Sequence, residues 1–94
     1  MLELDLKLTS GQALDECCRR GLVIRSEREL AGRVGSRHWH LRVPSRPGTL
    51  ELNEWQNRVW VKVHLLRDGG WATALAHELS ALGVEESASS TSSL

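Results

Sequence analysis

Two histidines stand two positions apart in the segment RHWHLRV, at His38 and His40, and a third, His64, follows in RVWVKVHL. In a β-strand, residues two apart point to the same face and lie about 6.6 Å apart along it. Two imidazoles from one strand, completed by a third from a neighbouring strand, would suit a zinc ion. Metal binding is therefore the first chemistry that these residues suggest, provided that the sheet brings His64 close to the other two.

The expected strand register argues against this three-histidine site. Matching apolar residues across a three-stranded meander pairs Leu41 with Leu52, and Leu52 in turn with Val59. In that register His64 lies about six residues, on the order of 20 Å, along the sheet from His40. No single ion bridges such a gap, so we expect no metal and no other cofactor. A two-histidine site completed by water or by a second chain is the alternative that this register leaves open.

The same register predicts a different surface on the polar face of the sheet. It pairs Arg42 with Glu51 across two strands and places Trp60 beside them, exposed and surrounded by cations. The partner-binding surface expected from this arrangement consists of Trp60, Arg58, Lys62, Arg42 and His40.

Two functions compete for this surface. Trp and Arg are enriched at the centres of protein interfaces, which favours contact with a protein partner or homodimerisation. An exposed aromatic ring among cations also suits single-stranded nucleic acid, RNA in particular, because bases stack on the ring while cations hold phosphates. We expect a non-catalytic protein-interaction module, with single-stranded nucleic-acid binding as the alternative. A solvated face without a partner remains the third interpretation.

The charge distribution bears on both functions. The net charge is zero, but residues 19–46 carry eight arginines and two acids, a charge of +6, and the rest of the chain carries −6. An uneven distribution of this kind attracts an anionic partner, unless the two parts neutralise each other within the fold.

The sequence offers few residues that could form an active site, so we expect catalysis less than a binding function. The segment RDGGW offers two glycine amides at a helix start that could bind an anion, but a tight turn explains them equally well. The adjacent Cys17 and Cys18 lie on the apolar side of a predicted helix, so we expect reduced thiols that pack in the core.

The periodicity of apolar residues predicts the elements that carry these side chains. Strict alternation predicts strands, and spacing at three and four residues predicts helices. A Thr9–Gln12 capping box begins the first helix, whereas Asp68 caps the second and Gly83 ends it. The expected strands are 2–8, 22–30, 37–43, 49–53 and 58–65, and the expected helices are 10–20 and 71–82.

This order, β-α-β-β-β-β-α, predicts a two-layer α+β sandwich in which a mainly antiparallel sheet carries both helices on one face. Residues 1–83 would form one domain, followed by a disordered Ser-rich tail over 84–94. No apolar run approaches the ~20 residues of a membrane span. Acids stand in the first residues where a signal peptide has a basic region, so the cytoplasm is the expected compartment.

Overall fold

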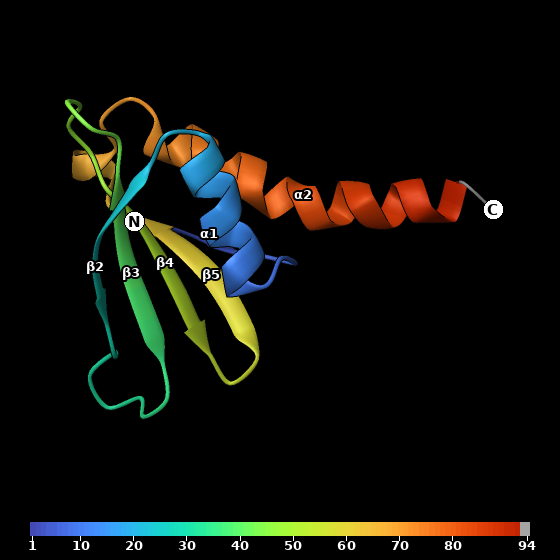
Figure 1. The fold of residues 1–94 in the computed structure, drawn as a ribbon, viewed down its shortest axis with the longest axis horizontal. Helices are drawn as coiled ribbons and strands as arrows, with labels where there is room; N and C mark the ends of the chain where they lie inside the picture. The colour runs from blue at the N-terminus through green and yellow to red at the C-terminus, as the bar shows by residue number, and fades with distance from the viewer. Residues whose placement is uncertain (93–94) are drawn as a thin grey trace.

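The computed structural model of the chain describes the backbone of residues 1–92 and the side chains of residues 1–83. The chain forms five strands, two α-helices and one short 3-10 helix, coloured in chain order in Figure 1. In chain order they are β1 (Leu2–Asp5), α1 (Ser10–Arg19), β2 (Val23–Arg28), β3 (Arg37–Arg42), β4 (Leu50–Trp55), β5 (Arg58–Val63), the 3-10 helix (Leu65–Arg67) and α2 (Ala72–Ser92).

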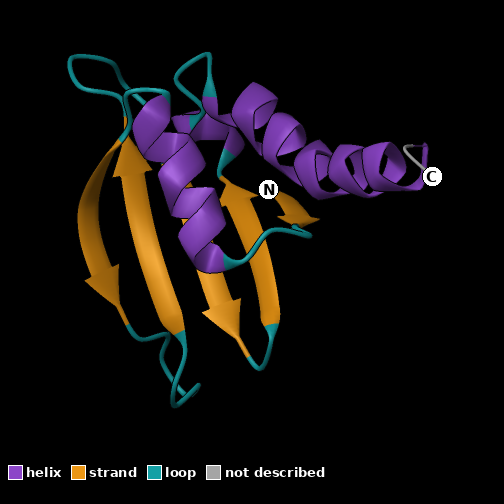
Figure 2. Cartoon of the chain, turned by 45° about the vertical axis from the view of Figure 1, so that its right-hand side comes forward, coloured by secondary structure: helices purple, strands orange, loops and turns teal. Residues whose placement is uncertain are grey.

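The strands form one antiparallel sheet in the order β1-β5-β4-β3-β2. Both helices pack on the same face of this sheet, as Figure 2 shows. The chain is therefore a small α+β domain with a helical layer over a five-stranded sheet, as its sequence predicts. The edge position expected for the second strand is also confirmed, because β2 pairs with β3 alone.

The core lies between the sheet and the two helices. The sheet contributes the apolar residues of its inward face, and the helices contribute their apolar stripes. Burial of each such Leu or Val side chain stabilises the fold by about 1.5–3 kcal/mol. The fully buried members include Trp39, Leu41, Leu50, Leu52, Val61, Val63 and Leu79.

The first helix begins as its sequence predicts. The Thr9 hydroxyl accepts a hydrogen bond from the Gln12 amide at 3.1 Å, and the Gln12 side chain accepts one from the Thr9 amide at 2.9 Å. This reciprocal pair satisfies two backbone donors that the first turn leaves free. Cys17 on the same helix is a buried free thiol, as expected, but Cys18 is exposed rather than packed.

The prediction that the second helix ends at Gly83 is wrong, because α2 continues to Ser92. A Cβ atom at Gly83 would overlap the side chain of Lys7, so this glycine lets α2 pass close to the segment after β1. Its role is close packing rather than a left-handed helix cap. The Ser-rich tail predicted to be disordered covers residues 84–94. The side chains of residues 84–92, and residues 93–94 altogether, lie outside the described part of the chain, so disorder of this tail stays a prediction.

The predicted register of the meander is wrong by two residues in each hairpin. Leu41 pairs with Leu50, and Leu52 pairs with Val61. A shift of two preserves which face each side chain points to, so the predicted core face is right although the pairing is not.

The turn between β4 and β5 explains the shift in the second hairpin. Gln56 and Asn57 form a two-residue hairpin loop with φ angles of 50° and 65°, a type I′ geometry that lets Trp55 pair directly with Arg58. The sequence lacks the Asn-Gly signal that marks such a turn, and apolar matching alone therefore predicts a longer loop there.

The edge strand β2 departs from simple alternation. A bulge interrupts its pairing with β3 between Ile24 and Ser26. Ile24 is 47% exposed although alternation places it toward the core, and Leu30, also predicted inside, lies in the following loop on the polar side. A bulge inserts one residue and bends the strand away from the sheet, which sequence periodicity does not show.

Candidate functional site

The polar face of the sheet presents two rows of side chains across the strands. His38 lies opposite Asn53, which lies opposite Trp60. In the neighbouring row His40 lies opposite Glu51. The predicted pair between Arg42 and Glu51 is therefore wrong, because the two-residue shift puts His40 in the place predicted for Arg42.

Trp60 points to the polar face, as predicted, but it is only 3% exposed. The guanidinium carbons of Arg58 and Arg33 lie 4.4 Å and 5.8 Å from its ring centroid. Arg33 belongs to the β2–β3 loop, which is held down by a 3.2 Å hydrogen bond from the Trp55 indole to the Val34 carbonyl. The loop covers the ring, and alternation alone could not show this.

The remaining residues of the predicted surface are also engaged or partly buried. Arg58 bonds Asp5 at 2.6 Å and Glu3 at 3.0 Å, and these hydrogen bonds raise the pKa of the guanidinium above its ordinary value. Lys62 is half-buried between Glu51 and Glu3 on the flanking strands, and Arg42 is half-buried opposite the edge strand. Their role in binding a partner stays a prediction.

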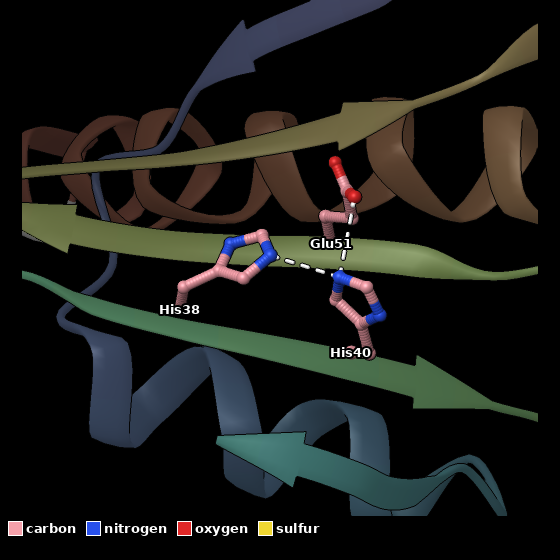
Figure 3. Close-up of side chains that lie close together, drawn as sticks. All are labelled: His38, His40 and Glu51. Carbon is pink, nitrogen blue, oxygen red and sulfur yellow. Dashed lines mark hydrogen bonds and ion pairs between the residues drawn. The ribbon is translucent and has the colours of Figure 1, made fainter. Parts of the chain in front are cut away.

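The third side chain of interest on this face is Glu51, which joins His38 and His40 in a compact cluster (Figure 3). The two Nε2 atoms lie 2.8 Å apart, and Nε2 of His40 lies 3.3 Å from Oε1 of Glu51. On its other side His38 donates from Nδ1 to the Asn53 side-chain oxygen. The sequence shows the two histidines, but only the true register brings in Glu51 and Asn53.

Partial burial and the neighbouring His38 lower the pKa of His40 below its ordinary value, although Glu51 acts in the opposite direction. The His40 imidazole is therefore neutral near pH 7, with a nitrogen lone pair available. His64 is exposed just after β5 and lines the same groove, but it lies outside the three-residue cluster among the described residues.

The cluster forms part of the floor of a groove of about 630 Å³ on the polar face. Its charged lining contains one acid, Glu51, and three arginines. Among the side chains that the structure describes, Arg25, Arg28 and Arg67 make no ion pair. The groove lining is Arg25, Ser26, Arg28, His38, His40, Thr49, Glu51, His64 and Arg67.

The basic segment 19–46 is only partly neutralised within the fold. Arg19 and Arg20 pair with Glu16, and Arg37 pairs with Glu27 at 2.7 Å. The groove arginines of β2 have no such partners among the described side chains, so the excess charge of this segment contributes to one face of the molecule.

The other two candidate chemistries fit structural roles. In RDGGW the Asp68 carboxylate accepts from the Gly70 amide at 2.9 Å and from the Thr73 amide, so it caps α2. A Cβ atom on Gly69 would overlap the Pro47 carbonyl oxygen, which identifies a tight turn. Burial, followed by the neighbouring Cys18, raises the pKa of the Cys17 thiol to about 12, so no thiolate forms there near neutral pH.

No helix within the described residues is long and apolar enough to cross a membrane. Comparisons of the chain with models of known protein families, with curated proteins and with solved structures found no match.

Proposed function

We propose that this chain is a small, non-catalytic interaction module that binds an acidic segment of a protein partner in the groove on the polar sheet face. The observation that carries the proposal is the set of three groove arginines without ion pairs among the described side chains. We assign the binding to the cytoplasm, in keeping with the free thiols of Cys17 and Cys18.

The positions of the arginines suit an extended acidic segment. Arg25 and Arg28 belong to the edge strand β2, whereas Arg67 follows β5. Three strand spacings, about 14 Å, separate these two sides of the groove, and four or five extended residues span that distance. A guanidinium presents two parallel N–H donors that match a carboxylate, so each arginine can hold one acidic side chain.

The same cations could hold phosphates, but single-stranded RNA also needs exposed aromatic rings on which bases stack. Trp60 is buried, and the Trp55 ring lies under the Arg33 guanidinium, whose central carbon is 5.0 Å from the ring centroid. Burial of Trp60 also removes the aromatic anchor that favoured homodimerisation. These facts support an acidic protein segment over the two other partners.

The test is a titration of the full chain, without an affinity tag, into a fluorescein-labelled oligoglutamate peptide, followed by fluorescence anisotropy. We expect saturable binding that weakens as salt rises, because screening reduces charge attraction. The double variant Arg25→Ala/Arg28→Ala should weaken binding by at least about tenfold, since hydrogen bonds between charged groups contribute about 1.5–3 kcal/mol each. Arg19→Ala is the matched control, because Arg19 is an exposed arginine on α1, on the opposite side of the sheet.

A labelled oligouridylate of equal charge is titrated in parallel. Tighter binding of the RNA than of the peptide would assign the groove to nucleic acid and overturn the proposal. Absence of peptide binding at low salt, or an equal loss in Arg19→Ala, would overturn it as well.

A further inference from the structure

We infer that His38, His40 and Glu51 form a binding site for one divalent transition-metal ion of the zinc type. The site does not depend on the acidic partner proposed above. Its three ligand atoms all lie within 4.8 Å of one another, on the adjacent strands β3 and β4.

The distances suit a tetrahedral ion. Ligand atoms about 2.0–2.1 Å from a tetrahedral zinc ion lie about 3.3 Å from one another. The separation of His40 from Glu51 already has this value, at 3.3 Å. The Nε2 atoms of His38 and His40, 2.8 Å apart, need to separate by only about half an ångström, which small side-chain rotations provide.

Asn53 prepares His38 for this role. An amide oxygen only accepts hydrogen bonds, so Nδ1 of His38 carries the proton and Nε2 turns its lone pair toward the other two ligands. A polar group that fixes the tautomer from behind is the usual partner of a metal-bound histidine. Asn53 is 1% exposed, and its Nδ2 has no hydrogen-bond partner in the structure. Burial of an amide nitrogen without a partner is unfavourable.

Hydrogen bonds within the cluster satisfy only one of its two facing acceptors. Nε2 of His38 and the Glu51 carboxylate both require a donor, and both face Nε2 of His40. A neutral His40 has at most one proton there, and one proton cannot be aligned well with two acceptors. A metal ion at the centre would instead accept a lone pair from all three atoms.

The donor set selects the class of ion. Two imidazole nitrogens and one carboxylate oxygen favour zinc and its transition-metal neighbours, whereas magnesium and calcium prefer sites made of oxygen. Three protein ligands leave the fourth tetrahedral position free, as in zinc sites that bind water or a further ligand. That position faces the groove that contains Arg25, Arg28 and Arg67, so the group that completes the site is water or an anion.

The experiment uses the full chain without an affinity tag, after treatment with a chelator and its removal. Zn²⁺ is titrated by calorimetry, and Co²⁺ by the visible absorption of its tetrahedral complexes. We expect one ion per chain, with a Co²⁺ spectrum typical of nitrogen and oxygen ligands. His38→Ala, His40→Ala and Glu51→Gln should each lower affinity at least about tenfold, and Asn53→Ser should lower it by about 10–100-fold.

His77→Ala is the matched control, because His77 is an exposed histidine on α2. Circular dichroism of each variant verifies folding, and the isosteric Glu51→Gln keeps the test valid if an alanine variant unfolds. Failure of the wild type to bind either ion, or unchanged affinity in both His40→Ala and Glu51→Gln, would overturn the site. The Arg25→Ala/Arg28→Ala variant should retain the ion. The metal site can therefore be confirmed even if the acidic-partner proposal fails.

Discussion

At the level of single residues, Trp60 and His40 show how neighbours change the meaning of a side chain. Alternation places both on the polar face, and the structure agrees. Trp60 is nonetheless buried, because Arg58 and the β2–β3 loop cover it. His40, predicted beside Trp60 on a partner surface, instead contacts His38 and Glu51. In both cases the face is predictable and the contacts are not, because contacts depend on register and loop path.

Trp60→Ala should lower the free energy of unfolding by about 3–5 kcal/mol, the usual effect of truncating a buried Trp. Urea denaturation followed by circular dichroism measures this change. The control is Val34→Ala, at a residue of the covering loop that is 87% exposed, and it should change stability by less than about 0.5 kcal/mol. Equal stability of Trp60→Ala and the wild type would mean that the ring is an exposed platform after all.

Among the elements, hydrogen bonds join the loop before β4 to the segment before α2. The Trp71 indole donates to the Pro47 carbonyl at 2.8 Å, and the Thr49 amide donates to the Arg67 carbonyl at 2.9 Å. Gly69 makes this approach possible, because any side chain there would meet the backbone of Pro47. This contact holds the end of β5 and the start of α2 beside the groove, and so positions Arg67.

Gly69→Ala should destabilise the fold by about 3 kcal/mol or more, because overlap of the new Cβ atom with the Pro47 carbonyl adds to an unfavourable positive φ. Gly32→Ala is the matched control. Gly32 also has a positive φ, +74°, but a Cβ atom there would meet no other atom within 4 Å, so only the φ cost of about 1–2 kcal/mol applies. Thermal and urea unfolding of both variants give the comparison, and equal losses would contradict the close approach of the two loops.

For the molecule as a whole, partial burial of His40 on the polar face makes the free energy of unfolding depend on pH. Partial burial and His38 lower the pKa of His40 in the folded state, so the unfolded chain binds this proton more readily. The free energy of unfolding therefore rises with pH between the two values. The contribution is complete above the ordinary pKa of 6.5 and is lost as pH falls through the lower folded value.

We expect the urea concentration at the unfolding midpoint of the chelator-treated protein to decrease when the pH is lowered from 7.5 to 5.5. His40→Gln, which carries no titrating group at that position, should reduce this fall, and His77→Gln should leave it unchanged. A pH dependence that is identical in His40→Gln and in the wild type would contradict the lowered pKa.

The amino-acid sequence predicts the five strands and two α-helices, their order, most of the core face and the antiparallel α+β class, but not the 3-10 helix at Leu65–Arg67, where Leu65, expected inward on a strand, is exposed. These features depend on local periodicity, on helix caps and on apolar burial, which are properties of neighbouring residues. Thr9 and Gln12 predict their helix start correctly, and the alternation in 58–65 predicts which side chains of β5 face the core.

The candidate sites, in contrast, depend on how the strands and loops come together in space. The register between β3 and β4, which the connection over residues 43–49 joins, brings Glu51 and Asn53 to the two histidines, and the β2–β3 loop buries Trp60. Both outcomes depend on backbone geometry in loops, where a two-residue shift costs nothing in hydrophobic alternation yet changes every cross-strand neighbour. For this reason the histidine pair is visible in the sequence, whereas the carboxylate and the amide that complete the candidate metal site are not.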